Sequence, residues 1–292
     1  MKSKLHIFGG GFVSYNVIKN LKDKYNIILY SRKPFEEFSG IKHIQVDNLA
    51  SYKEVREKNE SIFNDSVLIT ASTGGSRFKK DSWKDYINNI ESFMNIYATS
   101  LNCQSIFYIG SGAGEEVYTN FRSDFYALSK RIIGNFINRD CMDNLCEMVV
   151  YGSFGEKELD TRFIKSCFEN CRRGLPLYID KNIKFDYISM YDFSTILDYQ
   201  ISKGYIDNKI YCTYEEKRTL EQIARFINNL YNNKSIIIVR QEPDYTIDSD
   251  YTSPYSDYDE YSSICLGFEE SLIKMKTEYY DKLPEIKNER GS

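Results

Sequence analysis

The chain has 292 residues, enough for one large domain or two modest ones. Hydrophobic residues make up 42% of it and charged residues 27%, which is typical of a soluble globular protein. The formal net charge of −4 argues against nucleic acid as the main ligand, because nucleic-acid binding usually requires a basic face.

No segment predicts export, a membrane span or a metal site. Residues 5–8 lead directly into a glycine loop, a pattern that does not predict a secretory signal. No apolar run approaches the roughly 20 residues that cross a bilayer. The seven cysteines have neither disulfide-framework nor metal-ligand spacing. The only histidines are His6 and His43, so a histidine-based triad is not expected. We therefore expect a cytoplasmic protein with free thiols and no membrane partner.

Predicted strands and helices alternate through the first half of the chain. Strands are expected at residues 4–8, 26–30, 42–46, 66–70, 105–109 and 146–151. Helices are expected at residues 13–21, 52–60, 83–97 and 125–137. Strands separated by helices imply right-handed crossovers, so the predicted fold is α/β, a doubly wound parallel (Rossmann) sheet.

The second half is less regular. Helices are expected at residues 159–171, 220–231 and 269–281, and short strands at 185–188, 209–212 and 235–239. Residues 244–261 are acidic and tyrosine-rich, which predicts an irregular surface segment. We expect a dinucleotide-binding domain over residues 1–155, with return segments near 183–212. Residues 156–182 and 213–292 would form a smaller, partly interleaved C-terminal α/β substrate domain.

A glycine loop joins the first strand to the first helix. Gly9 permits a tight turn, Gly11 lets the backbone approach a pyrophosphate at the helix N-terminus, and the small Ser14 allows close packing of helix on strand. Glycine clusters also make plain turns, but this one follows a strand and opens an amphipathic helix. The position therefore favours dinucleotide binding.

The end of the second strand indicates which dinucleotide binds. An acidic residue there would bind the ribose hydroxyls of NAD, but the chain has Ser31 and Arg32, which can hold the 2′-phosphate of NADP(H). The alternative is a solvated pair formed by Arg32 and Lys33 in a turn. The predicted cofactor is NADP(H).

Tyr126 and Lys130 form the candidate catalytic pair. The Tyr-x-x-x-Lys spacing also occurs at Tyr15/Lys19, Tyr199/Lys203 and Tyr205/Lys209. Only Tyr126 and Lys130 lie on the helix after the fifth strand, one turn apart, near the carboxyl ends of the strands. An ammonium beside a phenol favours the phenolate, so the tyrosine can exchange a proton with a substrate oxygen. Ser111, at the end of the fifth strand, could hydrogen-bond the same oxygen, or could be a simple loop-entry hydroxyl.

At these motifs the chain resembles the extended short-chain dehydrogenases/reductases, which include NAD(P)-dependent epimerases, dehydratases and ketoreductases of nucleotide sugars. Tyr126-Ala-Leu-Ser-Lys130 matches the family's YxxSK element, and residues 109–113 match the strand end that carries its catalytic Ser or Thr. Residues 185–192 are similar to its R-D-F-x-x-V-x-D segment, and residues 266–272 to its C-terminal LGW-P-x-x-S-L element.

The resemblance implies roles for individual residues. Tyr126 would be the acid–base, Lys130 its partner and a nicotinamide-ribose ligand, and Ser111 a ligand of the substrate oxygen. The residues that would hold the dinucleotide are Gly9, Gly11, Phe12, Ser31, Arg32, Asp47, Ala71, Ser72 and Lys130. The chain departs from the family at Gly152, where a substrate-binding Asn is expected, and in a shorter stretch between Ser111 and Tyr126.

The residues also bear on the reaction. The resemblance implies that a dehydratase would have an acidic pair after Ser111, where this chain has Gly112 and Ala113. It also implies that an epimerase with tightly held NAD would have an acid at the end of the second strand, where this chain has Arg32. The predicted reaction is NADPH-dependent reduction of a keto group on a nucleotide-linked sugar. A nucleotide-sugar epimerase and a non-catalytic NADP(H)-binding regulator stay open as alternatives. The apolar stripe over residues 83–97 fits either a homodimer interface or a core helix.

Overall fold

The computed structural model describes residues 2–58, 62, 64–75, 80–115, 125–139, 143–203, 207–241 and 250–284. Across these ranges the central feature is a parallel seven-stranded sheet, in the order β10-β6-β5-β4-β1-β2-β3. Its strands are β1 (Lys4–Phe8), β2 (Asn26–Ser31), β3 (Lys42–Gln45), β4 (Ser66–Ile69), β5 (Ser105–Ser111), β6 (Leu145–Val150) and β10 (Lys209–Tyr211). The predicted doubly wound sheet is confirmed.

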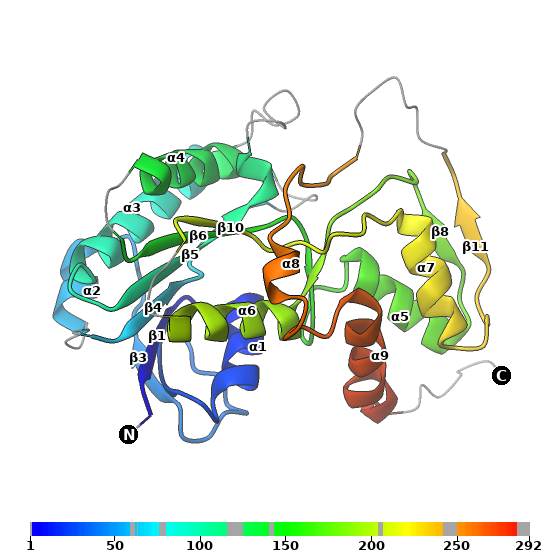
Figure 1. Ribbon diagram of the computed structural model, residues 1–292, viewed down its shortest axis with the longest axis horizontal. Coiled ribbons are helices and arrows are strands. Elements are labelled where there is room, and N and C mark those ends of the chain that lie inside the picture. Colours follow the sequence, from blue (N-terminus) through cyan, green and yellow to red (C-terminus); the bar gives the residue numbers. More distant parts are fainter. Residues whose placement is uncertain are drawn as a thin grey trace, which may run out of the picture.

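Helices cover both faces of this sheet (Figure 1). One face carries α1 (Phe12–Leu21) and α6 (Met190–Lys203), and the other carries α2 (Tyr52–Lys58), α3 (Trp83–Thr99) and α4 (Phe125–Arg139). Alternate residues of β1 explain the two layers, since Leu5 and Ile7 pack into the core on the α1 side and Phe8 into the core on the α3 side. Strands buried on both faces read as continuous apolar runs, which is why the sequence located them.

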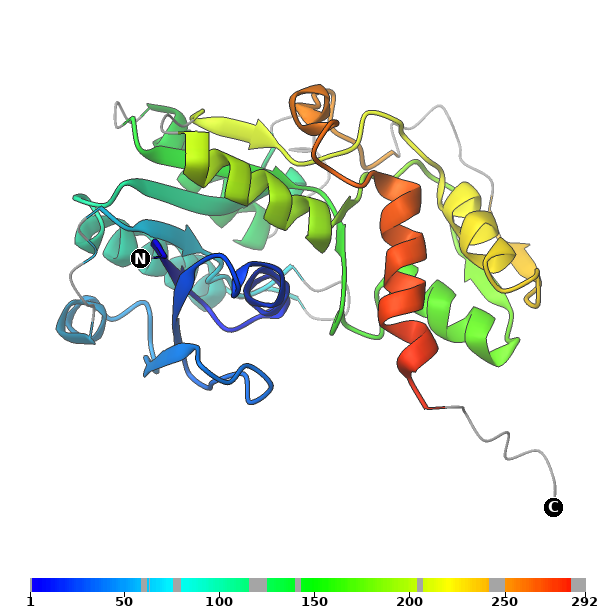
Figure 2. The ribbon, with the colours of Figure 1, turned by 60° about the horizontal axis from the view of Figure 1, so that its bottom comes forward.

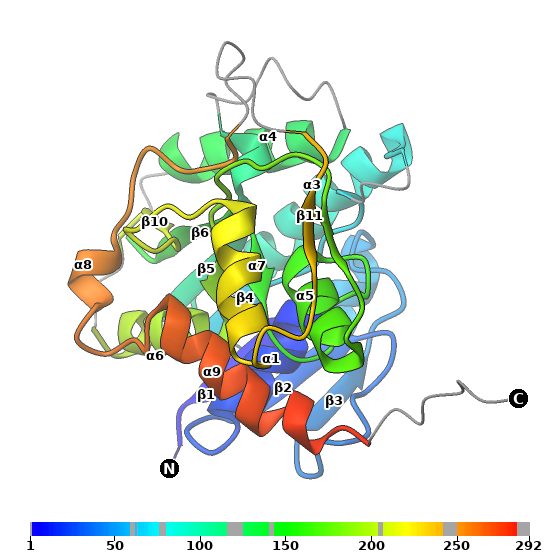
Figure 3. The same cartoon turned by 90° about the vertical axis from the view of Figure 1, so that its right-hand side faces the viewer.

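The C-terminal elements lie beside the sheet (Figures 2 and 3). They include α5 (Phe163–Arg173), α7 (Leu220–Asn229) and α9 (Phe268–Glu278), with a parallel pair formed by β8 (Leu177–Ile179) and β11 (Ile237–Val239). A second short parallel pair joins β7 (Ser153–Phe154) to β9 (Ile188–Ser189). The core on the α1 side runs on into this region, as Leu5 and Leu272 belong to the same buried cluster.

Two expectations for the second half were incomplete or wrong. Helix α6 was not expected, although Phe193, Leu197 and Ile201 have helical spacing and the Asp192 amide donates to the Ser189 hydroxyl at its start. Residues 250–261 are not a plain surface segment, because they contain the short helix α8 (Tyr258–Tyr261) and Tyr261 is only 1% exposed. Residues 242–249 lie outside the described residues.

Candidate active site

The glycine loop leaves the start of α1 open. Gly9 has φ of 119°, and a Cβ there would lie 2.5 Å from the hydroxyl oxygen of Thr70, so only glycine fits. Gly11 is the N-cap of α1 and has no side-chain cap, and a Cβ on it would meet nothing within 4 Å. The first backbone N–H groups of α1 are therefore accessible to an anion, as a pyrophosphate site requires.

The next strand end presents an exposed cation. Arg32 directly follows β2, and its guanidinium has no hydrogen bond or ion pair to any residue that the structure describes. The Ser31 hydroxyl is buried and donates to the carbonyl oxygen of Lys33 at 2.6 Å, with His43 Nε2 3.2 Å away. Arg32 is thus available for a phosphate, whereas Ser31 shapes the turn that carries it.

The ends of β3 and β4 complete this edge of the sheet. Asp47 is exposed, and its backbone amide donates to the Glu54 carboxylate of α2 at 2.6 Å. Ala71 and Ser72 lie on the loop that leaves β4, half-buried and exposed respectively. All four strand ends that the sequence singled out for the cofactor therefore face the same carboxyl edge, as parallel pairing requires.

The structure brings Tyr126 and Lys130 together at the start of α4. The Lys130 ammonium lies 5.6 Å from the centre of the Tyr126 ring and 4.5 Å from that of Tyr108. Its Nζ donates to the Ile109 carbonyl oxygen at 2.6 Å. Burial lowers the pKa of Lys130 to about 7, an effect that Glu147 partly offsets. A lysine that titrates near neutrality suits proton exchange with a neighbouring phenol.

The loop after β4 packs directly on the tyrosine ring. A Cβ on Gly75 would lie 3.0 Å from two ring atoms of Tyr126, and Gly75 has φ of 73°. The Asp81 carboxylate accepts from the Gly75 amide at 3.0 Å, which holds the loop in this position. The loop that would carry cofactor contacts at Ala71 and Ser72 thus reaches the candidate acid–base.

Asn89 of α3 is a positioning residue that the sequence reasoning missed. It is 3% exposed, and its amide donates to the Thr73 carbonyl oxygen at 2.9 Å and to the Ser129 hydroxyl at 3.0 Å. Ser129 in turn donates to the Tyr126 carbonyl oxygen at 2.7 Å. These hydrogen bonds connect the loop after β4 to the first turn of α4. The sequence shows only an asparagine within the helix of the apolar stripe, and this does not identify its partners Thr73 and Ser129.

Ser111 ends β5 beside an aromatic ring. Its hydroxyl oxygen accepts from the Ala113 amide at 3.2 Å, and its own proton has no acceptor among the described residues. The ring of Tyr151 covers Gly112, where a Cβ would lie only 2.4 Å from it. Ser111 can therefore donate to a substrate oxygen.

An aromatic cluster fills the region around Gly152. Phe185 and Tyr187 stack with ring centres 4.7 Å apart, and Tyr251 lies 4.8 Å from Phe185 and 5.2 Å from Tyr151. A Cβ on Gly152 would lie 2.7 Å from the Phe185 ring. The Asn that the family resemblance implies at this position therefore cannot fit without rearrangement. This end of β6 therefore presents aromatic rings where the resemblance implies an amide side chain.

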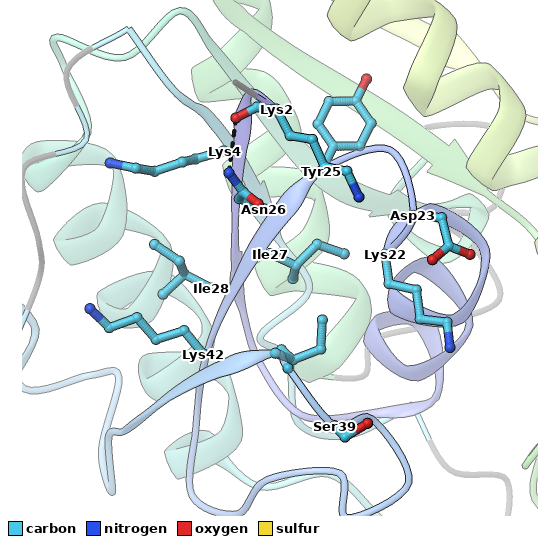
Figure 4. Close-up of a pocket in the computed structure, with 12 residues that line it drawn as sticks. Lys2, Lys4, Lys22, Asp23, Tyr25, Asn26, Ile27, Ile28, Ser39 and Lys42 are labelled. Carbon is cyan, nitrogen blue, oxygen red and sulfur yellow. Dashed lines mark hydrogen bonds between the residues drawn. The ribbon is translucent and has the colours of Figure 1, made fainter.

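A hollow of about 520 Å³ lies at the opposite, amino-terminal edge of the sheet (Figure 4). Four lysines line it, but the ammonium groups of Lys4 and Lys42 lie to one side of the strand ends and those of Lys2 and Lys22 to the other. They do not converge on one point, so this hollow lacks the geometry of a phosphate site and is separate from the predicted cofactor edge.

No family model matches this chain, and no curated protein does. Solved structures match over nearly its whole length. The UDP-N-acetylglucosamine 4-epimerase from Bacillus cereus is 18% identical, with a TM-score of 0.71 over 98% of this chain and 99% of that one. The UDP-glucose 4-epimerase of Thermus thermophilus, in complex with NAD, is 13% identical, with a TM-score of 0.74 over 96% and 100%.

The Bordetella bronchiseptica enzyme WbmF, in complex with NAD+ and UDP, is 13% identical and has a TM-score of 0.76 over 96% of this chain and 94% of that one. Two of these three structures are named as UDP-sugar 4-epimerases, and two are complexes with NAD or NAD+. The predicted resemblance is therefore confirmed for the fold. Within the described residues, no helix has the length and apolar character needed to span a bilayer.

Proposed function

We propose that the protein is an NADPH-dependent reductase of a keto group on a nucleotide-linked sugar, working in the cytoplasm. The observation that carries the proposal is the Tyr126–Lys130 pair, packed on the β4 loop at the same sheet edge as the open start of α1. A protein that only sensed the dinucleotide would have no need of this acid–base pair. The fold that it shares with sugar-nucleotide enzymes supports the substrate class.

The residues present suit the proposed chemistry. Bound NADPH would supply a hydride to the carbonyl carbon of the substrate. Tyr126 would give its phenolic proton to the carbonyl oxygen, and the ammonium of Lys130 would stabilise the phenolate that results. The Ser111 hydroxyl would donate to the same oxygen and orient it. Gly9, Gly11 and Phe12 would hold the pyrophosphate at α1.

The first experiment measures NADPH oxidation with nucleotide-linked 4-keto-6-deoxy sugars. Tyr126→Phe should lower kcat by about 10²- to 10⁴-fold, because it removes the proton donor and keeps the ring that packs on Gly75. Binding of NADPH, followed by fluorescence, should stay close to that of the parent protein. Undiminished turnover by the Phe variant would contradict the assignment, and Tyr199→Phe, from another Tyr-x-x-x-Lys pair, is the matched control.

The cofactor choice has its own test. Arg32→Ala should raise KM for NADPH about 10- to 100-fold by removing charge-assisted hydrogen bonds to the 2′-phosphate, and it should change KM for NADH little. Lys33→Ala, the neighbouring exposed cation, is the control and should have a smaller effect. An unchanged ratio of the two KM values in Arg32→Ala would rule out the proposed NADP(H) preference.

A nucleotide-sugar epimerase is the second candidate, because two of the matching structures are named as UDP-sugar 4-epimerases. An epimerase returns both hydride and proton to its substrate and consumes no NADPH. Conversion of UDP-linked sugars without net change in cofactor absorbance would favour it over the reductase. Stoichiometric NADPH oxidation would favour the reductase.

A further inference from the structure

A carboxylic acid is buried on the second strand from one edge of the central sheet. Glu147 is on β6, between β5 and β10, and is only 3% exposed. Burial raises the pKa of Glu147 to about 7, against the lowering effects of Lys209 and Lys130. A buried acid destabilises the fold relative to an aliphatic residue at the same position, so its presence calls for a reason beyond packing.

Two glycines keep space for this carboxyl group. A Cβ on Gly110 of β5 would lie 2.5 Å from Glu147 Oε1, and a Cβ on Gly134 of α4 would lie 2.7 Å from the same atom. Both glycines have ordinary backbone angles, so neither is needed for a turn. Glycine in the interior of a helix is destabilising, so Gly134 is a second unfavourable feature that makes room for Glu147.

Titratable side chains from β5, β10, α4 and the turn after β5 surround the carboxyl group. Lys209 of β10 lies 3.5 Å from Glu147 Oε2 and binds Glu115, which follows the turn after β5, at 2.8 Å. Lys130 of α4 acts on it through space, and Glu147 in turn acts on the Tyr108 hydroxyl of β5. Apart from its ion pair with Lys209, Oε2 of Glu147 makes no hydrogen bond to a described residue.

A hollow of about 270 Å³ joins these groups. Lys130 and Glu147 both line it, together with Glu115 and Lys209. The exposed Asn138 of α4 is also part of its lining, so the hollow reaches the surface. Its volume holds several water molecules, and its polar walls can bind them.

We propose that Glu147 is a positioning residue that passes protons between Lys130 and the water of this hollow. The inference rests on the proposed roles of Tyr126 and Lys130. It goes beyond them by giving the buried lysine a second proton partner, reached from the α4–β10 side of the sheet.

During reduction, each proton moves one step from the hollow towards the substrate. When Tyr126 has given its proton to the substrate, an N–H bond of Lys130 breaks and the phenol O–H bond re-forms. An O–H bond of protonated Glu147 then breaks and, through a water molecule, the N–H bond of Lys130 re-forms. The Glu147 carboxylate finally takes a proton from water in the hollow. One proton enters from solvent in each turnover, which a net reduction requires.

The deciding variant is Glu147→Gln, which keeps the size of the side chain and abolishes its titration. Because the carboxylate supports the charged form of Lys130, its loss should lower the pKa of Lys130 by about one unit, measured by NMR of 15N-labelled lysine. The alkaline limb of the pH profile of kcat/KM should move to lower pH, and the solvent deuterium isotope effect on kcat should rise.

Glu158→Gln is the matched control, since Glu158 is equally buried and belongs to another region of the fold. It should leave the Lys130 titration and the pH profile unchanged. Should Glu147→Gln fail to fold, Lys209→Met is the second test of proton transfer through Glu147. Loss of the Lys209 cation should raise the pKa of Glu147.

Unchanged Lys130 titration and pH profile in Glu147→Gln, with only a lower Tm, would overturn the proposal and leave Glu147 a structural residue. The NMR titration needs no substrate. A protein that shows the Lys130 shift yet reduces no keto-sugar would therefore refute the proposed function while supporting the coupling.

Discussion

Ser14 occupies the position of the third glycine in the predicted dinucleotide loop. Its side chain is fully buried, and its hydroxyl donates to the Gly9 carbonyl oxygen at 2.6 Å and lies 2.7 Å from the Thr70 hydroxyl. The small side chain permits close packing of α1 on the sheet, and its hydrogen bonds join the ends of β1 and β4. Ser14 therefore keeps the close packing that the third glycine of the Gly-x-Gly-x-x-Gly pattern provides, and it adds hydrogen bonds.

Restoring glycine at this position should weaken the protein. Ser14→Gly loses the hydrogen bonds and adds a helix glycine, so the free energy of unfolding should fall by about 1–2 kcal/mol, measured by urea denaturation. Ser14→Ala separates the two causes, since it loses only the hydrogen bonds. Affinity for NADPH should change little in both. Equal stability of the Gly variant and the parent would show that the hydrogen bonds contribute nothing.

At the residue scale the sequence predicted the candidate site in part. Gly9, Gly11 and the Tyr126–Lys130 pair could be read because turn geometry and helical spacing are local properties. Asn89 and Glu147 could not, because their significance depends on partners that are distant in the chain, Ser129 for one and Lys209 for the other. Long-range polar partners leave no periodic signal.

At the scale of elements, α3 and α4 present an apolar outer face. Trp83 is 57% exposed, and Met94, Leu128 and Ile132 are each 38–39% exposed, although the same two helices also fill the core. The stripe on α3 is therefore both a core face and a surface face. Two adjacent helices with exposed apolar residues favour pairing with a second copy of the chain.

We expect a homodimer through this face, visible as twice the chain mass in light scattering coupled to size exclusion. The double variant Leu128→Glu/Ile132→Glu should be monomeric, because it would bury four charges in a symmetric interface. Ile236→Glu, at an apolar residue that is 71% exposed elsewhere, should leave the mass unchanged. A monomeric parent protein at high concentration would contradict the prediction.

The elements themselves divide into those that the sequence could and could not locate. Buried parallel strands are continuous apolar runs, and all of the predicted strands of the first half are present. Helix α6 was missed because tyrosine, serine and aspartate interrupt its apolar face. Some of these polar residues are buried and make hydrogen bonds inside the fold. Asp192, fully buried, accepts from Tyr214 at 2.6 Å and from the Leu266 amide at 2.7 Å.

At the scale of the whole molecule, buried acids make stability depend on pH. Glu158, before α5, is 4% exposed, and burial raises its pKa from 4.5 to about 8. Arg162 and Lys165 oppose this rise, and the Lys165 ammonium binds the neighbouring Asp160 at 2.7 Å. The folded chain therefore holds a proton on Glu158 through a range in which the unfolded chain has released it.

The sign of the effect follows from this difference. The contribution of Glu158 is fully present below pH 4.5 and is lost as pH rises towards 8, at up to about 1.4 kcal/mol per pH unit. Glu158→Gln does not titrate, so its stability relative to the parent protein should increase steadily from pH 5 to pH 8 in urea denaturation. Asp160→Asn is the control, since Lys165 lowers the pKa of that exposed carboxyl below its ordinary 3.8 and its effect should be flat over the same range. A constant difference between Glu158→Gln and the parent would mean that Glu158 is ionised in the folded protein, and that Arg162 and Lys165 outweigh its burial.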